Sequence, residues 1–300
     1  MKAEPTALDP GGTNAVGRML GLLGDEWTLL IIQQALLGAT RYGDFIQRLP
    51  ISNSVLTNRL RTLTDHGLLA RAEYQTRPVR AEYLMTERGR AFWPVLLSIW
   101  EWERRWVPAH VHLLPGMRHT QCGSDFAPTL NCLACGEAVT EKEVTARWGP
   151  SGSWPRSVPE GSTRRRSSGG EAGLFPETMS VFGNRWAAAL LVCAFLGTSR
   201  FSDFETQLGV PPSLLSKRLQ TFCANGVLST SPEAGYRLTE KGRAFFPVII
   251  AALQCGQHWF HAPEGPAVLL THVGCGASFV GRLTCDQCAR PLKGAHVIVD

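Results

Sequence analysis

The sequence lacks a run of apolar residues long enough to cross a lipid bilayer. Its apolar stretches, such as TLLII and FPVII, are short, whereas a membrane-spanning helix needs about 20 residues. The N-terminal stretch MKAEPTALDP contains no apolar segment, so we expect no secretory signal peptide. Together these absences predict a protein that has no membrane contact and acts in the cytoplasm, where thiols stay reduced.

The sequence also lacks the local patterns of common enzyme sites. It contains no nucleophile elbow, no phosphate-binding loop, no paired-carboxylate motif and no open metal site. Asp25 and Glu26 stand side by side before Trp27, but adjacent acids at a helix N-terminus are favoured by the helix dipole. We therefore expect a protein that is not an enzyme.

Cysteine, in contrast, is plentiful, with nine residues in a chain of 300. In a reducing compartment this indicates metal binding or redox chemistry rather than structural disulfides. HTQCGSDFAPTLNCLAC begins at His119 and HVGCGASFVGRLTCDQC begins at His272. Both stretches read H-x2-C-G-x8-C-x2-C, and their matched positions are 153 residues apart.

Each pattern offers three thiols and one imidazole, a ligand set that suits a tetrahedral zinc ion. We predict two structural zinc ions per chain, one in each of two zinc-ribbon-like segments. The predicted ligands are His119, Cys122, Cys132 and Cys135 for the first ion, and His272, Cys275, Cys285 and Cys288 for the second. His110, His112 or a water could replace His119. The alternative is that the cysteines are redox-controlled thiols without metal.

The cysteine patterns belong to a longer internal repeat. LGLLGDEWTLLIIQQALLGATRYGDF and SVLTNRLRTLTDHGLL have counterparts 159 residues later in MSVFGNRWAAALLVCAFLGTSRFSDF and SLLSKRLQTFCANGVL. MTERGRAFWPVL has its counterpart, LTEKGRAFFPVI, 153 residues later, so six residues are missing from the second copy between Gly226 and Thr239. Residues 149–173, rich in Gly, Ser and Pro, predict a flexible linker between the copies.

Each copy contains a helix-turn-helix pattern followed by a hairpin. In the first copy RYGDFIQRL predicts a short helix that ends at Pro50, and Ser52 or Asn53 can cap a second helix that ends at Gly67. The alternating stretch around Arg77 predicts a β-hairpin, which in this position is a wing. TERGRAFWPVLLSIWEWERRW then predicts one long, buried helix.

These segments resemble the HxlR family of bacterial winged-helix transcription regulators, roughly over residues 15–107 and again over 174–261. The resemblance implies a MarR-like winged fold that binds DNA as a two-fold dimer. It also implies that the first and last helices make the contacts between the two halves of the dimer. We therefore expect a mainly α fold with a small β part, of class α+β. The expected domains are a winged helix-turn-helix (1–107), a zinc-ribbon-like segment (108–148), the linker (149–173), a second winged helix-turn-helix (174–261) and a second zinc-ribbon-like segment (262–300).

This organisation predicts a sequence-specific regulator of double-stranded DNA, acting as a repressor on the nucleoid. Recognition helices enter the major groove, and wings meet the backbone or the minor groove. The expected contacts are Ser52, Asn53, Ser54, Thr57, Asn58, Arg59, Arg61, Arg71, Arg77 and Arg80 in the first copy, and Ser213, Ser216, Lys217, Arg218 and Arg237 in the second. The second wing is shorter and carries Glu233, so we expect the first copy to supply more of the affinity.

Two questions stay open at the level of sequence. One chain could supply both halves as an intramolecular pseudo-dimer, which we favour, or it could form a homodimer with a second chain. The alternative function is a protein-interaction or redox- or ligand-sensing module whose second copy serves assembly. A small-molecule effector could bind between the helices beside the tryptophans, although aromatic residues at such spacings more often form the core.

Overall fold

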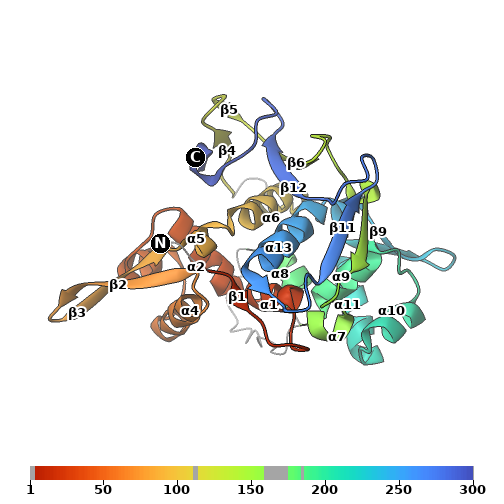
Figure 1. Cartoon of the computed structure of the whole chain (residues 1–300), viewed down its shortest axis with the longest axis horizontal. Coiled ribbons are helices and arrows are strands. Elements are labelled where there is room, and N and C mark those ends of the chain that lie inside the picture. The colour runs from red at the N-terminus through yellow and green to blue at the C-terminus, as the bar shows by residue number, and fades with distance from the viewer. Residues whose placement is uncertain (1–3, 111–113, 159–174, 184–185, 300) are drawn as a thin grey trace.

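A computed structural model describes residues 4–110, 114–158, 175–183 and 186–299. Two winged-helix units of the same design meet through their long helices at the centre of the molecule (Figure 1). The predicted α+β class, with two winged helix-turn-helix units, is confirmed. In the described residues no helix is both long enough and apolar enough to span a bilayer.

The helices and strands of the two units follow one another in the same order. The first unit contains α1 (Ala15–Leu23), α2 (Glu26–Leu36), α3 (Tyr42–Arg48), α4 (Asn53–Asp65), β2 (Leu69–Thr76), β3 (Val79–Met85), α5 (Glu87–Arg90) and α6 (Trp93–Trp106). The second contains α8 (Pro176–Phe182), α9 (Ala187–Phe195), α10 (Phe201–Leu208), α11 (Pro212–Ala224), β8 (Leu228–Ser231), β9 (Gly235–Leu238), α12 (Glu240–Arg243) and α13 (Phe246–Trp259).

The long helix that we predicted after each wing is in fact two helices. In the first unit α5 ends at Arg90 and α6 begins at Trp93, with Pro94 in its first turn. Proline has no N–H to donate and is tolerated only in the first turn, so it marks a new start. The second unit breaks in the same way between α12 and α13.

The two units share one apolar core, because the long helices pack on each other and on the first helix of the other repeat. Helix α13 lies against both α1 and α6. A Cβ added at Gly256 of α13 would lie only 2.9 Å from Cβ of Met19 and 3.0 Å from the carbonyl oxygen of Ala15. The glycine thus permits a backbone approach between the repeats that no larger residue would allow.

Helix α6 packs against α8 of the second repeat through a polar contact. Glu103 occupies the position that corresponds to Gly256 and is fully buried. Its carboxylate accepts hydrogen bonds from the backbone N–H of Thr178 at 2.9 Å and from the hydroxyl of Thr178. The other carboxylate oxygen lies 2.7 Å from Nδ1 of His110. Within one chain, therefore, each repeat meets the other through its first and last helices.

We had predicted two separate ribbons after the long helices, but the strands of these two segments pair with each other. Their strands are β4 (Met117–His119), β5 (Ser124–Asp125), β6 (Pro128–Cys132) and β7 (Val144–Trp148) from the first repeat, and β11 (Val268–His272), β12 (Gly281–Cys285) and β13 (Val297–Val299) from the second. Strand β6 pairs with β12, β4 with β13 and β7 with β11, all antiparallel. Each of these three pairings joins the two repeats, whereas the pairing of β4 with β5 lies within the first repeat.

The pairing of β6 with β12 marks the local two-fold axis of the repeat. Leu130 faces Leu283, which is its own counterpart in the second copy. Both leucines are buried in a small second core with Leu97 of α6 and Ile250 of α13. The ribbon strands therefore rest on the two central helices as one shared layer.

The first part of the predicted linker is structured. Residues 154–157 form α7 (Trp154–Ser157), which packs on α1. The side-chain amide of Asn14 donates to Oγ of Ser157 at 2.9 Å and to the carbonyl of Ser151 at 3.1 Å. The linker expected from residue 149 is thus wrong for this part, and residues 159–173 of it lie outside the described residues. The remaining short elements are β1 (Thr6–Ala7), β10 (Phe260–His261) and the 3-10 turns η1 (Glu141–Glu143) and η2 (Gly294–His296).

Candidate nucleic-acid interface and metal centres

Helix α4 has one buried and one exposed face. Leu56, Leu60 and Leu63 are completely buried against the first unit. Oγ of Ser52 caps the helix by accepting the backbone N–H of Val55 at 3.5 Å, as its sequence predicted. The apolar spacing therefore fixes which face of α4 meets solvent.

The exposed face of α4 carries most of the polar residues expected to meet DNA. Asn53, Ser54, Thr57, Asn58 and Arg61 are all exposed, as is the capping Ser52. Nη2 of Arg61 donates to Oδ1 of Asn58 at 2.9 Å, so these two side chains lie side by side on the exposed face. Short polar and basic side chains near the start of such a helix are the groups that reach base edges in the major groove.

Tyr42 of α3 was not among the expected site residues, yet it fixes the start of α4. Its hydroxyl donates to the backbone carbonyl of Asn53 at 2.9 Å and lies 3.1 Å from Oδ1 of the same residue. It also lies 3.3 Å from the hydroxyl of Thr57. Only the packing of α3 on α4 reveals this role, because nothing in the local sequence pairs residue 42 with residue 53.

Arg59 differs from the other polar residues of α4. Its Nη2 lies 2.6 Å from Oδ2 of Asp25, and its Nε donates to Oδ1 of the same carboxylate at 2.9 Å. Asp25 is itself the cap of α2 through the backbone N–H of Thr28. Arg59, which we had expected to contact DNA, therefore binds both oxygens of the Asp25 carboxylate and braces α4 against α2.

The first wing, formed by β2 and β3, carries exposed cations near its tip. Arg77 and Arg80 are exposed, and neither has an acidic partner among the described residues. Arg71 lies further down β2, where its Nη1 lies 2.6 Å from Oε1 of Glu73. Of the three wing arginines that we predicted, Arg77 and Arg80 are thus the freest to meet phosphate.

The second recognition helix, α11, keeps the same design with fewer polar groups. Ser213 and Lys217 are exposed and Ser216 is half-buried. Arg218, the counterpart of Arg59, is also half-buried, and its Nε has no hydrogen-bond partner in the part of the chain that the structure describes. Burial lowers the pKa of Arg218. The position that corresponds to Asp25 is Asn184, which lies outside the described residues.

The second wing is short. Strands β8 and β9 are joined by a turn in which Oγ of Ser231 accepts the backbone N–H of Ala234 at 3.0 Å. Arg237 is exposed on β9, and Glu233 is exposed at the turn. With one cation and one acid, this wing carries less positive charge than the first.

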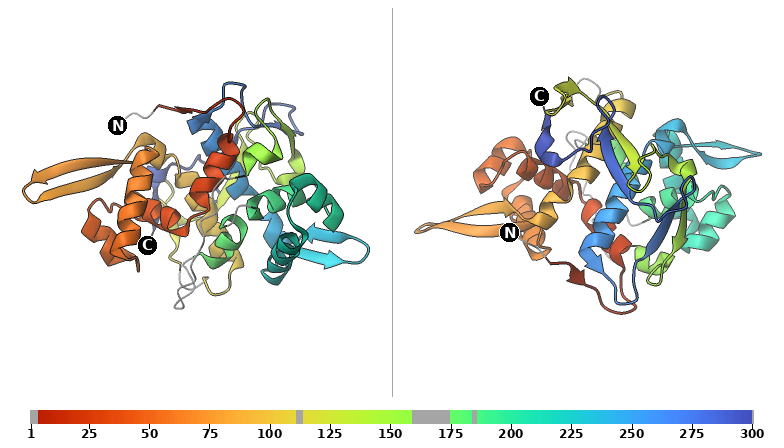
Figure 2. Two further views of the ribbon diagram at one scale, coloured as in Figure 1. Left: turned by 90° about the horizontal axis from the view of Figure 1, so that it is seen from below. Right: turned by 45° about the horizontal axis from the view of Figure 1, so that its top comes forward.

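The two candidate DNA-binding surfaces lie on one side of the molecule. In Figure 1 α4 and α11 lie along the lower edge, whereas the ribbon strands β4, β6 and β12 lie along the upper edge. The two wings point to opposite ends of the molecule in both figures (Figure 2). This placement allows both recognition helices to approach one DNA duplex while the ribbon strands face away from it.

The cysteines and histidines of the ribbon strands gather in two clusters. We name them the first cluster, with His119, Cys122, Cys285 and Cys288, and the second cluster, with Cys132, Cys135, His272 and Cys275. In each cluster the four ligand atoms lie within 4.8 Å of one another. All eight predicted ligands are therefore used, but each cluster takes two ligands from each repeat, which corrects the predicted grouping within one repeat.

The distances inside the clusters fit a tetrahedral ion. Nδ1 of His119 lies 3.5 Å from Sγ of Cys122 and 3.4 Å from Sγ of Cys288, and the sulfurs of Cys122 and Cys285 are 3.9 Å apart. Nδ1 of His272 lies 3.2 Å from Sγ of Cys275. Ligands bound tetrahedrally to zinc at usual bond lengths would be about 3.6 to 3.8 Å apart. The clusters are compatible with zinc without rearrangement.

Antiparallel pairing explains why the ligands cross between repeats. Cys132 stands at the end of β6, beside Gly281 at the start of β12, and Cys285 at the end of β12 pairs with Pro128 at the start of β6. A strand of five residues is about 16 Å long, so one repeat cannot bring the ligands at both ends of its own strand to one ion. The partner strand supplies the missing pair at each end.

The other candidate ligands lie elsewhere. His110 is engaged with Glu103, so it does not replace His119, and His112 lies outside the described residues. Cys193 and Cys255 are buried among apolar side chains, and burial raises the pKa of each thiol to about 12. Such thiols stay protonated and do not act as ligands.

Comparison with known proteins agrees with the geometry. The family model described as HxlR-like helix-turn-helix matches residues 22–111 and again 181–264. The uncharacterized HTH-type transcriptional regulator Rv3095 of Mycobacterium tuberculosis is 38% identical over 136 residues, which are 45% of this chain and 86% of that protein. A similarly described regulator of Synechocystis, sll1512, is 33% identical over 106 residues, 35% of this chain and 78% of that protein.

Among solved structures, a protein of Pseudomonas aeruginosa described as a candidate transcription factor is 30% identical, covering 48% of this chain and 97% of that chain with a TM-score of 0.37. Both curated relatives are described as HTH-type transcriptional regulators. Since the family model covers more than half of the sequence, in two copies, the chain belongs to the HxlR-like helix-turn-helix family of DNA-binding regulators.

Proposed function

We propose that the chain is a sequence-specific repressor of transcription that binds double-stranded DNA with both repeats at once, as an intramolecular pseudo-dimer. The observation that carries this proposal is the presence, in one chain, of two helices that each carry exposed polar residues and that both lie along the same edge of the molecule (Figure 1). A protein with two DNA-binding units covers a stretch of the duplex. When that stretch lies in a promoter, the bound protein blocks access of the polymerase. Its place of action is the cytoplasm, on the nucleoid.

The first repeat supplies most of the affinity in this proposal. Asn53, Ser54, Thr57, Asn58 and Arg61 read base edges from α4, capped by Ser52. Arg77 and Arg80, assisted by Arg71, meet phosphates or a narrow minor groove from the wing. In the second repeat Ser213, Ser216, Lys217, Arg218 and Arg237 play the same roles with less charge, while Arg59 supports α4 in the first.

We also propose that both clusters hold structural zinc. All four ligands of each cluster are protein atoms, which is typical of a structural site rather than a catalytic one. The distances between ligand atoms support this assignment over a thiol switch. A zinc ion loaded in each cluster predicts a metal content of two ions per chain.

We place the predicted small-molecule effector between the two repeats. A cavity of about 560 Å³ lies between α2 and α6 of the first repeat and residues 294–299 of the second, and Leu36, Trp93 and Trp100 are among the residues that line it. An apolar ligand bound there would quench or shift tryptophan fluorescence. Titration with aromatic and aliphatic carboxylic acids tests this placement, and unchanged emission with every member of both series would remove it.

The experiment that tests the proposed function starts from DNA that the protein itself selects. Purified protein is incubated with sheared DNA of its host at physiological salt, and the retained fragments are sequenced. We expect enrichment of a small set of promoter fragments. The selected fragment then serves in transcription with purified polymerase, where the protein should lower the yield of transcript.

Two matched variants separate reading of DNA from support of the fold. Arg61→Ala should weaken binding to the selected fragment without changing the melting temperature, because Arg61 is exposed. Arg59→Ala should lower the melting temperature, because it leaves Asp25 without its partner. Retention of random fragments only, at the same salt, would contradict sequence-specific binding and favour the protein-interaction alternative.

A further inference from the structure

We propose that each zinc ion is a bridge between the two repeats, and that metal loading fixes the two recognition helices in the relative position that binding of one duplex requires. This inference rests on the proposed function, both for the zinc and for the DNA. It concerns the coupling of the two repeats rather than the folding of either one.

The first step is the origin of the ligands. In the first cluster the His-x2-Cys pair comes from the first repeat and the Cys-x2-Cys pair from the second, and in the second cluster the origins are reversed. Neither repeat alone can offer an ion more than two of its four ligands in either cluster. Loss of the ion therefore breaks a connection between repeats, whereas loss of zinc from an ordinary ribbon disrupts a single hairpin.

The second step is the position of the clusters. They lie at opposite ends of the β6–β12 pair, because Cys132 ends β6 and Cys285 ends β12. The strands form five facing residue pairs, from Gly281 with Cys132 to Cys285 with Pro128, so three pairs separate the two end pairs that contain a cluster cysteine. An isolated two-stranded pair is only marginally stable in water, so an ion at each end keeps this pair closed.

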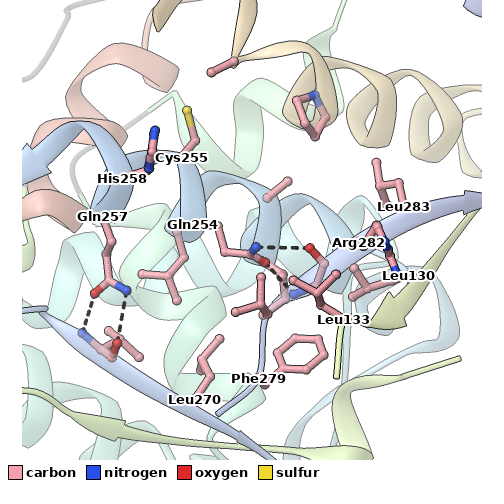
Figure 3. A pocket seen from close by; sticks show the side chains of 18 of the residues that line it. Leu130, Leu133, Gln254, Cys255, Gln257, His258, Leu270, Phe279, Arg282 and Leu283 are labelled. Atoms are coloured by element: carbon pink, nitrogen blue, oxygen red, sulfur yellow. Dashed lines mark hydrogen bonds between the residues drawn. The ribbon is translucent and has the colours of Figure 1, made fainter. Parts of the chain in front are cut away.

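The third step is the attachment of the strands to the central helix. Gln254 of α13 accepts the backbone N–H of Gly281 at 3.0 Å and donates to its carbonyl at 3.1 Å. Gln257 holds Val268 of β11 in the same two-bond manner, at 2.8 and 3.1 Å. Figure 3 shows both glutamine side chains reaching from α13 to the strands.

The two clamps lie beside a cavity of about 720 Å³ between helix and strands, lined by Leu270, Phe279 and Leu283 among others (Figure 3). The hydrogen bonds of the clamps therefore add a directed link to the apolar contacts that join the ribbon strands to α13. Bonds of this kind depend on the strands staying in register, which the ions secure.

The last step leads from α13 to the DNA-binding units. Helix α13 belongs to the second repeat, and through Gly256 it lies in direct contact with α1 of the first. The ribbon layer and this helix contact together set the angle between the units. The clusters lie on the side away from α4 and α11 (Figure 1), so the ions act on geometry and do not touch the DNA.

The first test is the metal content of two paired variants, measured by mass spectrometry on purified protein, with circular dichroism to show that the helices remain. Cys122→Ser with Cys285→Ser removes two ligands of one cluster and should leave one zinc ion per chain. Cys122→Ser with Cys132→Ser removes one ligand from each cluster and should leave less than one. The reverse result would show that each ion is held within one repeat, and equal loss in both variants would also overturn the proposal.

The second test measures coupling on DNA. Duplexes selected from a random library by the zinc-loaded protein are compared with the same duplexes carrying only one half-site. Removal of zinc with a chelator should lower affinity for the full site by about tenfold or more, since the advantage of two linked readers is lost. Affinity for the half-site should change by less than about twofold. The variant that lacks a ligand in each cluster should show no further response to the chelator.

The outcomes separate the two proposals. A zinc-loaded protein that selects no DNA contradicts the proposed function but leaves the metal test intact. A purified chain that holds no zinc contradicts the proposed cofactor and the bridge together. If zinc is present and the chelator weakens full-site and half-site binding equally, or weakens neither, the DNA function stands and the coupling role of the metal is wrong.

Discussion

The two repeats place different residues at the same position of their last helix. Glu103 of α6 meets the second repeat through hydrogen bonds with Thr178 and His110, whereas Gly256 of α13 meets the first repeat through bare contact with Met19 and Ala15. Two identical subunits must use the same residue in both of these contacts. A fused pair is free of that constraint, and here one contact became polar and the other became close-packed.

The same divergence separates the DNA-binding elements. The first repeat keeps a long wing with Arg77 and Arg80 exposed, while the second has a short wing with Arg237 and Glu233. The cysteine and histidine residues of the two clusters, in contrast, stand at equivalent positions in both repeats. The two repeats therefore differ in their wings and in their helix contacts, while the cluster residues are the same.

The largest expected effect comes from Glu103→Ala. The substitution leaves the buried N–H of Thr178 and the ring of His110 without their acceptor, which should cost about 3 kcal/mol of stability. Thermal or urea unfolding measures the loss. Glu103→Gln, which keeps an acceptor for Thr178, is the control and should cost clearly less. Equal losses in both variants would show that charge rather than the acceptor matters here.

Gly256→Ala tests the opposite side of the comparison. The added methyl group would lie 2.9 Å from Cβ of Met19, closer than real contacts, and 3.0 Å from the carbonyl oxygen of Ala15, which is a tight contact, so we expect α13 to move away from α1. We expect a loss of about 2 kcal/mol in urea unfolding. The control is Gly43→Ala, where an added Cβ meets nothing within 4 Å. A silent Gly256→Ala would mean that the two helices are not held at this distance.

The wings should differ in their contribution to DNA affinity. Replacing Arg77 and Arg80 with Ala removes two phosphate contacts and should reduce the slope of log affinity against log salt by about two units. Replacing Lys217 and Arg237 in the second repeat removes the same number of charges and should reduce it by less. Binding titrations at four salt concentrations measure both slopes. A greater change in salt slope from the second pair of substitutions would show that the second repeat supplies more of the DNA affinity.

The buried acid also predicts how stability depends on pH. Burial raises the pKa of Glu103, opposed by its hydrogen bonds with Thr178 and His110. The folded state then binds a proton more readily than the unfolded state, where the pKa is near 4.5. The wild type should therefore lose stability relative to Glu103→Gln as pH rises from about 4.5 through the raised pKa. A difference that grows in favour of the wild type over this range would contradict the predicted shift.

The smallest expected effect lies in the turn after each Cys-x2-Cys pair. Gly136 takes this position in the first repeat with φ of 82°, whereas Ala289 takes it in the second with φ of 55°. Side chains other than glycine are strained in this region, so Ala289→Gly should stabilise the protein by about 1 kcal/mol. Gly136→Ala should destabilise it by a similar amount. The melting temperature of the zinc-loaded protein measures both effects. Changes of the same sign in the two variants would contradict the proposed backbone strain at this position.

Much of the fold could be predicted from local sequence. The apolar spacing of α4, its cap at Ser52 and the stop at Gly67 all lie within one short stretch, so no distant contact is needed to read them. The exposed polar face of that helix follows from the same spacing. Arg59 is the exception, because its partner Asp25 lies 34 residues away and only the packing of α4 on α2 brings them together.

The linker shows another limit of composition. Glycine, serine and proline around residues 149–158 predicted a flexible chain, but Trp148 and Trp154 pack edge to face with ring centroids 5.0 Å apart. Buried hydrogen bonds from the side-chain amide of Asn14 to Ser151 and Ser157 also hold this segment in place. Average composition does not register such isolated anchors.

What the sequence by itself determined is the repeated design: two winged helix-turn-helix units, the polar face of each recognition helix, and eight cysteine and histidine residues in two matched patterns. What only the tertiary structure decided is which of these cysteines and histidines gather in one cluster and which helices meet across the repeats. The reason is that both copies carry the same spacing, so pairing within a repeat and pairing between repeats are indistinguishable along the chain. The antiparallel register of β6 with β12 removes that ambiguity, because it brings the end of each strand to the start of the other.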